Sequence, residues 1–386
     1  MGKKNIDNVD MRKKKQLRRS LLRFLILVLI AAFCVFLYVE RGSWLTGMEN
    51  KIDSIRQNDG VLADGNFPLS ISGNGDYQAE IMEDDLAILN NSYLYLYSDQ
   101  GESLDTRQIA YTNAVMQSGG DRILCFENGG IGFRVDNTNG CVYEKEAENI
   151  IISGDISSSG YTALITESNT YSCSIYVYSQ NGKKLYTRNC VERVNEICFN
   201  PDNSGCVFVQ LDASDGEISS VLKCIEFDKE EIIWEAPALS TLCLEASYTS
   251  DGRICIIGDS VCAYYNKKGQ MESMYTYSGS LISYDAENGQ AAILVRSDET
   301  RETNLLLFDS SAESPMVIPV NNSASYVKLN GSTACLMSTD NVVAYSFEGK
   351  AVATVNLDFS YDRFLRQDEY LFLMSYDQID RVNFNQ

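Results

Sequence analysis

The sequence predicts an all-β fold, a β-propeller of eight four-stranded blades, preceded by one N-terminal transmembrane helix. Two observations indicate the propeller: a hairpin pattern returns about every forty residues from residue 93 onward, and a second turn signal precedes its copies. Strand repeats of this length must bury their faces against one another, which is typical of propeller blades. A third observation, a basic N-terminus followed by an apolar run, indicates the membrane segment.

The N-terminus divides into a basic tail, 1–20, and an apolar segment, 21–39. As a helix the segment would be roughly 28 Å long, close to the apolar thickness of a bilayer. Nine Lys and Arg residues lie before Phe24, and only Arg41 directly follows the segment. The positive-inside rule therefore predicts a cell-membrane protein with a cytoplasmic N-terminus and an extracytoplasmic remainder.

Three other interpretations of this segment compete with the anchor. A cleaved signal peptide needs a shorter apolar core and small residues at the cut site, but Tyr38-Val-Glu-Arg41 follows here. A lipoprotein needs a small residue before Cys34, and Phe33 occupies that position. A buried core helix is the third alternative.

Residues 40–66 are polar and are predicted to form a juxtamembrane stalk, and 67–386 the extracytoplasmic propeller. A short self-associating helix in the stalk is the alternative, because Leu45, Met48, Ile52 and Ile55 have helical spacing. Residues 1–41 hold ten Lys/Arg and three Asp/Glu, a net of +7, so the rest of this −21 chain carries −28. An ectodomain this acidic would repel nucleic acid and anionic lipid, so neither is expected as a partner.

Two turn signals define the expected blade. The hairpins join the third and fourth strands of a blade, C and D. The clearest copy is 175–186, which turns across Asn181-Gly182. The others are 94–101, 133–140, 262–269 and 343–349, with weaker copies at 224–228 and 305–309. Asx, Ser and Gly turns join the first two strands, A and B, at 156–161, 200–205, 248–253 and 285–290, with looser versions at 83–85, 118–121, 330–331 and 367–369.

These signals give eight A–B turns but only seven complete C–D hairpins. The chain ends on a C strand, 378–384, and Phe67-Pro-Leu-Ser-Ile-Ser72 is expected to supply its missing D partner. That pairing would close the ring with the two ends of one chain and remove exposed edges. Seven blades is the alternative count, and a β-solenoid is disfavoured because its coils are usually shorter.

The motifs also resemble known families. The A–B turns Asn200-Pro-Asp-Asn203 and Thr249-Ser-Asp-Gly252 resemble those of TolB and WD40-like propellers, and the hairpin 175–185 resembles quinoprotein-like blades. With the basic tail, the single anchor and the absence of His, the whole chain is similar to the DUF5711 family of membrane-anchored bacterial proteins. That family has no assigned activity. The Trp and Cys-Cys features of quinone-binding propellers are absent except for Trp234, so no cofactor is expected.

Candidate chemistry is sparse. The sequence has no His, which removes the commonest metal ligand and the usual base of catalytic triads, and no Cys-x-x-Cys pair. The acidic loop Asp212-Ala-Ser-Asp-Gly-Glu217 lacks the calcium-loop pattern and is expected to be a solvated turn. Carboxylates could meet in the central funnel, but the sequence assigns none. No catalytic, cofactor-binding or metal-binding residue is predicted.

Two cysteines form a candidate disulfide. If Asn181-Gly182 is a two-residue type I′ turn, Cys173 lies opposite Cys190 on the paired strands, within disulfide range. Cys255 and Cys262 would also face each other if Gly258-Asp259 turns.

The function expected from these features is non-catalytic: a protein-binding or scaffolding module that recognises another membrane or cell-envelope protein. A sensor or receptor for a small ligand or glycan is the alternative, and a carboxylate-based hydrolase or lyase is a third class. The oligomeric state is left open.

Overall fold

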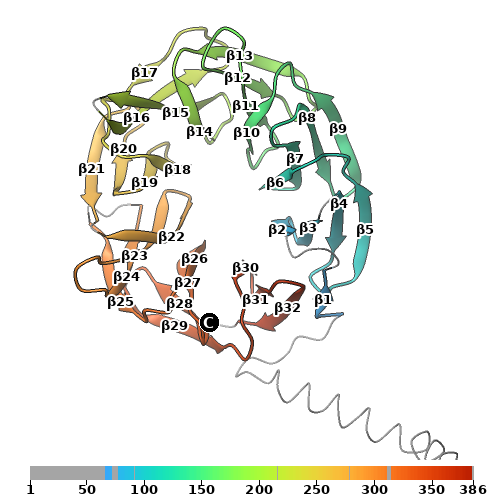
Figure 1. Cartoon of the computed structure of the whole chain (residues 1–386), viewed down its shortest axis with the longest axis vertical. Helices are drawn as coiled ribbons and strands as arrows, with labels where there is room; N and C mark the ends of the chain where they lie inside the picture. The colour runs from blue at the N-terminus through green and yellow to red at the C-terminus, as the bar shows by residue number, and fades with distance from the viewer. Residues whose placement is uncertain are drawn as a thin grey trace, which may run out of the picture. The chain divides into compact units, whose positions relative to one another are not determined.

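The computed structural model describes residues 66–71, 77–90, 92–214, 216–277, 279–310 and 314–384. In these residues 32 β-strands form eight four-stranded antiparallel sheets. The sheets stand around a central opening like the blades of a propeller (Figure 1). The predicted all-β, eight-bladed propeller is confirmed, and the alternative of seven blades is wrong.

Each blade contributes one strand to each of four concentric positions (Figure 1). The innermost strands are β2 (Tyr77–Met82), β6 (Ala114–Gly119), β10 (Ile151–Ile156), β14 (Arg193–Phe199), β18 (Cys243–Tyr248), β22 (Ser280–Glu287), β26 (Tyr326–Asn330) and β30 (Arg363–Gln367). The second strands are β3 (Asp85–Asn90), β7 (Arg122–Glu127), β11 (Thr162–Thr166), β15 (Gly205–Ser214), β19 (Ile254–Gly258), β23 (Gln290–Arg296), β27 (Thr333–Met337) and β31 (Tyr370–Met374). The third strands are β4 (Tyr93–Tyr97), β8 (Gly132–Asn137), β12 (Cys173–Tyr178), β16 (Glu217–Glu226), β20 (Val261–Tyr265), β24 (Thr303–Phe308), β28 (Asn341–Ser346) and β32 (Gln378–Asn383). The outer strands are β5 (Ser103–Gln108), β9 (Gly140–Glu146), β13 (Lys184–Cys190), β17 (Trp234–Glu235), β21 (Met271–Thr276), β25 (Met316–Val320), β29 (Ala351–Asn356) and β1 (Leu69–Ser70).

The hydrophobic core lies between neighbouring blades. One cluster joins Ile165 and Ile175 of the third blade to Val194 and Phe208 of the fourth. Strands in the middle of a sheet, such as β11 and β19, are buried at every position, because another blade covers each of their faces. Each blade therefore needs both neighbours to remove its apolar surface from water.

The predicted closure of the ring is confirmed. In the eighth blade the order is β1-β32-β31-β30, so the strand at the start of the propeller completes the last blade. Leu69 pairs with Ile379 and Ser70 with Gln378. The guanidinium of Arg381 lies over the ring of Phe67 at 5.3 Å and so packs the two ends of the propeller together.

The hairpin between β12 and β13 differs from the predicted type I′ turn. The N–H of Gly182 donates to the carbonyl of Ser179 at 2.8 Å, so the central residues of the turn are Gln180 and Asn181. Gly182 follows with a φ of 74°, the left-handed conformation that forms a bulge after a turn of this kind. The predicted two-residue turn is therefore wrong.

The bulge restores the predicted pairing farther along the hairpin. Tyr178 pairs with Lys184, and the register then shifts by one residue, so that Val177 pairs with Tyr186. From that point outward the partners are those that the two-residue turn would have given. Cys173 and Cys190 accordingly lie opposite each other.

The predicted tail at 1–20, the membrane segment at 21–39 and nearly all of the stalk at 40–66 lie outside the described residues. Within the described part of the chain, no helix has the length and apolar character needed to cross a bilayer. The anchor and the orientation of the chain stay predictions.

Candidate functional site

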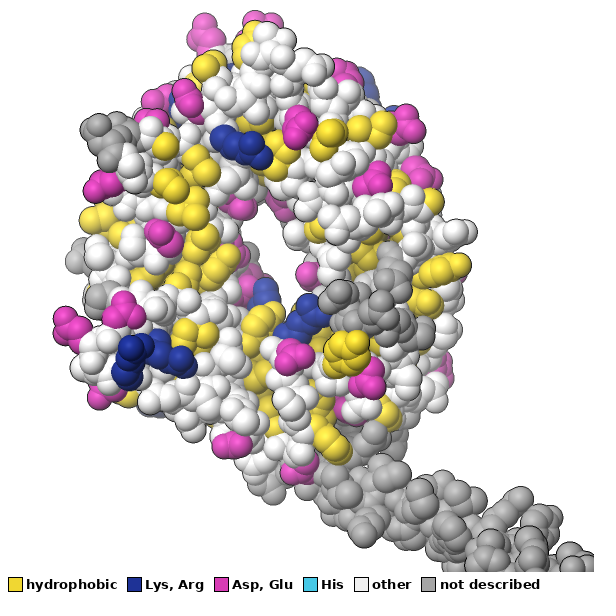
Figure 2. Space-filling view, viewed as in Figure 1, with side chains coloured by type: hydrophobic (Ala, Val, Ile, Leu, Met, Phe, Trp, Pro, Cys, Tyr) yellow, Lys and Arg dark blue, Asp and Glu magenta, His cyan; other side chains and the backbone are white. Residues whose placement is uncertain are grey.

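The A–B turns of seven consecutive blades, from the second to the eighth, surround a cavity of about 770 Å³ at one end of the central opening. Figure 2 shows that the opening stays free of side chains at its centre and that acidic and basic groups lie along its wall. The turns can approach this closely because several of their residues adopt positive φ, for example Gly120 at 60° and Asn203 at 57°. We call this cavity the funnel.

Five carboxylates on innermost strands form what we call the acidic belt: Glu80, Asp155, Glu196, Glu245 and Asp285. Asp155, Glu245 and Asp285 line the funnel. Glu196 is close enough to Asp155 and Glu245, and Glu80 to Asp285, for their charges to interact. The five residues come from β2, β10, β14, β18 and β22. Each lies a few residues before an A–B turn, so the strand direction brings them to the same end of the ring. These five residues were not predicted from the sequence. The signal that could have found them is a carboxylate shortly before the A–B turn in five of the blades.

Burial favours the neutral form of four of the belt acids, Glu80, Asp155, Glu196 and Glu245. Burial raises the pKa of Glu245 to about 7, with a further contribution from the Asp285 carboxylate. Burial also raises the pKa of Asp155 to about 6 and that of Glu196 well above its usual range, where Asp155 and Glu245 add repulsion. These side chains are only partly exposed, so their carboxyl groups are poorly solvated.

Most belt carboxylates brace one blade against the next. Asp285 accepts a hydrogen bond from the N–H of Leu329 at 2.7 Å and pairs with the ammonium of Lys328 at 2.6 Å. Glu245 accepts from the N–H of Ala286 at 3.2 Å. In the first blade Glu80 accepts from the hydroxyl of Ser118 at 3.1 Å. The belt therefore links innermost strands that have no backbone ladder between them.

The acidic belt supports few kinds of chemistry. A carboxyl whose pKa lies near 7 can exchange a proton at neutral pH, which a general acid or base must do. The enzyme alternative required clustered acidic residues in the funnel, and they are present. Nevertheless, no group of three or more Asp, Glu or Cys side chains among the described residues is arranged to hold a metal ion.

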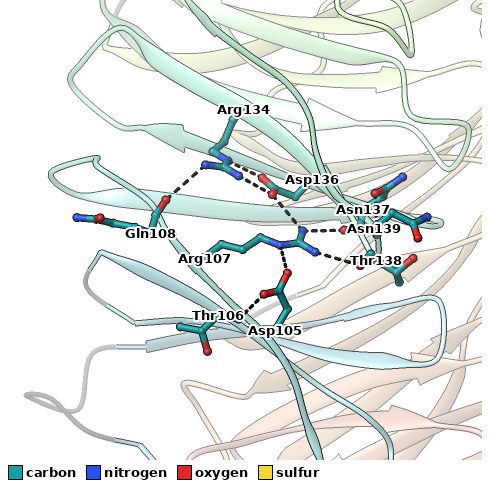
Figure 3. Close-up of polar contacts among 9 residues, drawn as sticks. All are labelled: Asp105, Thr106, Arg107, Gln108, Arg134, Asp136, Asn137, Thr138 and Asn139. Carbon is teal, nitrogen blue, oxygen red and sulfur yellow. Dashed lines mark hydrogen bonds and ion pairs between the residues drawn. The ribbon is translucent and has the colours of Figure 1, made fainter.

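A second charged cluster lies between the first two blades (Figure 3). Asp136, with no exposed surface, accepts from Arg134 at 2.6 Å through both of its oxygens and from Arg107 at 3.1 Å. Arg107 also donates to Asp105 at 2.8 Å and to the backbone carbonyls of residues 137 and 138. The two guanidinium groups and the two carboxylates neutralise one another and hydrogen-bond to one another. We therefore interpret this cluster as structural and call it the lock.

The structure brings the candidate disulfide residues together. Cys173 and Cys190 are opposite partners at the ends of β12 and β13, they are buried, and both are thiols. Cys255 and Cys262 do not face each other as the sequence suggested. Cys262 pairs with Ile257, so the two cysteines are diagonal neighbours with sulfur atoms 4.0 Å apart.

Solved structures with the same architecture have very different sequences. BamB from Moraxella catarrhalis is 12% identical, with a TM-score of 0.54, and the match covers 84% of this chain and 100% of BamB. Sqt1 from Saccharomyces cerevisiae is 10% identical, with a TM-score of 0.58 and coverage of 84% and 99%. No curated protein matches the chain in sequence.

An enzyme is also among the similar structures. The dihydro-heme d1 dehydrogenase NirN, solved in complex with DHE, is 11% identical with a TM-score of 0.55, and the match covers 77% of this chain and 76% of NirN. Identities this low establish the propeller fold alone, because one fold carries many unrelated functions.

The family resemblance expected from the turn motifs is confirmed over nearly the whole propeller. Residues 69–384, from the closing strand β1 to the end of the last blade, match the family described as "Family of unknown function (DUF5711)". The chain therefore belongs to the DUF5711 family.

Proposed function

We propose that this chain is a non-catalytic binding module that recognises another membrane or cell-envelope protein through its funnel. The observation that carries the proposal is the bracing role of the acidic belt. Three of its carboxylates accept hydrogen bonds from the neighbouring blade: Asp285, Glu245 and Glu80. Catalytic acids instead need a free face toward a substrate.

The funnel supports recognition of a protein by its shape and its charge. It is open at the mouth and lined by short turns of seven blades, so a protruding segment of a partner can contact many turns at once. The predicted ectodomain carries a net charge of −28, which would accelerate encounter with a basic partner. Propellers of this kind present broad loop surfaces on a rigid ring.

The proposal includes the location of the chain. Residues 21–39 would hold it in the cell membrane as a single-pass helix, with residues 1–20 in the cytoplasm and the propeller outside. Support comes from the basic residues before the apolar segment and their scarcity after it. A membrane-impermeant amine reagent on intact cells is expected to label the exposed Lys267 and Lys268 and to leave Lys3 and Lys4 unlabelled; the reverse pattern would refute this orientation.

Recognition through the funnel can be tested by site-specific photocrosslinking in membranes. A photoreactive amino acid at Ser158 or at Ser250, both exposed funnel residues, is expected to give one discrete crosslinked protein. The matched control is Val352, which is 40% exposed on the outer strand β29 and lies away from the funnel. Equal crosslinking at all three positions, or none at the funnel, would contradict the proposal.

The size of the funnel favours one second candidate, a receptor for a small ligand or glycan. Its volume of about 770 Å³ is in the range of small-molecule sites. The same crosslinking experiment separates the candidates when it is combined with thermal unfolding of the purified chain. Stabilisation by envelope glycans without any protein crosslink would support the receptor.

A further inference from the structure

We propose that Cys173 and Cys190 are oxidised to a cross-strand disulfide that joins β12 to β13 in the third blade. The inference goes beyond the binding function and does not depend on it. It extends the sequence-based pairing to a specific modification site with an assigned chemistry.

The register supplies the geometry. Directly opposed residues on antiparallel strands have Cα atoms about 4.5–5.5 Å apart, within the range that a disulfide spans. Cys173 begins β12, Cys190 ends β13, and the two are each other's partners. A bond here would join the two strands at the end of the hairpin opposite its turn.

The hydrogen bonds around the pair assign a role to each sulfur. The sulfur of Cys173 accepts a hydrogen bond from the N–H of Val194 at 3.4 Å, at the start of the fourth blade. A hydrogen bond from the Cys190 thiol, followed by the Val194 N–H, lowers the pKa of Cys173 to about 7. The same hydrogen bond to Cys173, followed by burial, acts in the opposite direction on Cys190 and raises its pKa. Cys173 is therefore the sulfur that becomes the thiolate first.

The oxidation balances as thiol–disulfide exchange with an oxidant that is itself a disulfide, either a small one or that of an oxidoreductase. The Cys173 thiolate attacks one sulfur of the oxidant, forms a mixed disulfide and releases the other sulfur as a thiolate. The deprotonated Cys190 then attacks the Cys173 sulfur and releases the second thiolate. The protein loses two protons and two electrons, and the oxidant becomes a dithiol or two thiols.

Access for the oxidant follows from the position of the pair. Both sulfurs are buried in the closed fold, but their neighbours are open to solvent: Tyr171 is 45% exposed and Val191 73%. Fraying of the strand ends, which costs less than global unfolding, would expose Cys173 without disturbing the rest of the ring.

The chain contains its own control pair. The sulfur atoms of Cys255 and Cys262 are 4.0 Å apart, but these residues are diagonal neighbours rather than opposite partners. If proximity of sulfurs alone governed oxidation, this pair would oxidise as readily. If the opposed register governs it, only Cys173 and Cys190 will form a bond.

The test is peptide mapping of the purified full-length chain after incubation with oxidised glutathione, denaturation and alkylation of free thiols. Trypsin leaves Cys173 as the only cysteine of peptide 146–183 and Cys190 as the only cysteine of peptide 189–193. The disulfide is expected as a linked species of these two peptides, lighter than their sum by two hydrogens and abolished by dithiothreitol. Peptide 254–267 should carry two alkyl groups.

Single variants complete the test. Cys190→Ser should abolish the linked species and leave Cys173 as a mixed disulfide with glutathione, whereas Cys262→Ser should leave the linked species unchanged. Oxidation should raise the melting temperature of the native chain but not that of Cys190→Ser. Alkylation of both cysteines in the oxidised native chain, or a native chain that stops at the mixed disulfide, would overturn the proposal.

Discussion

Replacing Glu245 by Gln removes one negative charge from the acidic belt and preserves the shape of the side chain. The amide oxygen of Gln can still accept the hydrogen bond from Ala286 N–H, which Glu245 accepts at 3.2 Å. The substitution therefore isolates the charge of this carboxyl from its bracing role.

The sign of the expected effect follows from the pKa of Glu245, which burial first and Asp285 second raise from 4.5 to about 7. A carboxyl whose pKa is higher in the folded than in the unfolded chain binds its proton more tightly when folded. Its contribution to stability is fully present below about pH 4.5 and is lost as the pH rises through about 7. The native chain should therefore lose stability over this window.

The magnitude can be bounded from the same shift. A rise of about 2.5 units at 1.36 kcal/mol per unit gives an upper limit of about 3 kcal/mol. Glu245 is also partly exposed to water, which screens its charge, so about 1–2 kcal/mol is the expected effect. Glu245→Gln should thus unfold at a higher urea concentration than the native chain at about pH 8 and should differ little from it at about pH 4.5.

The assay is urea unfolding of the purified full-length chain across that pH range, followed by tryptophan fluorescence. Asp155 contributes with the same sign in both proteins and largely cancels in the difference, whereas loss of the Glu245 charge also relieves repulsion at Glu196, which adds to the stabilisation at high pH. Glu231→Gln, at an exposed position, serves as the control and should give no pH-dependent difference. A difference between Glu245→Gln and the native chain that stays constant with pH would refute the reasoning.

Three further predictions, made with five substitutions, test the structural account by denaturant unfolding. Asp136→Ala leaves two buried guanidinium groups without their shared carboxylate and should lower the free energy of unfolding by about 3–5 kcal/mol. Asp105→Ala removes a half-exposed partner and should lower it by less than about 1 kcal/mol. Equal losses would contradict the structural role of Asp136. Leu69→Ala creates a cavity where the first and last strands of the propeller pair and should cost about 2–5 kcal/mol. No loss of stability would show that this pairing does not hold the ring closed. Gly120→Ala should destabilise the fold more than Gly129→Ala. Both glycines have positive φ, but only at Gly120 would an added Cβ clash with backbone, since it would lie 2.2 Å from the carbonyl oxygen of Ser158. Equal losses of stability would contradict this steric argument.

Much of the fold could be read from the sequence because its instructions are local. Asn, Asp, Ser and Gly at regular spacing specify turns between strands that pair with their immediate neighbours in the chain. The count of eight blades and the role of residues 67–72 followed from one missing outer strand, and β1 occupies that position. The pairing of Cys173 with Cys190 was also predicted, although the turn assumed for it was wrong, because a one-residue bulge compensates for the longer loop.

Contacts between blades could not be predicted from the sequence. The lock of Arg107 on Asp136 joins residues 29 positions apart, and the hydrogen bond from Leu329 to Asp285 spans 44. No local turn rule states which residues of one blade face the next, since that depends on the twist of each sheet and on how the ring closes.

The sequence alone determined the kind of ring, because strand periodicity and turn chemistry act over a few residues. Only the tertiary structure decided what lines its centre. Glu196 and Glu245 share a poorly solvated wall because closure of the ring brings their strands to one axis, and their pKa values rise for that reason. The chemistry of the funnel is thus a property of the closed ring, because each carboxyl takes its solvation and its neighbours from other blades.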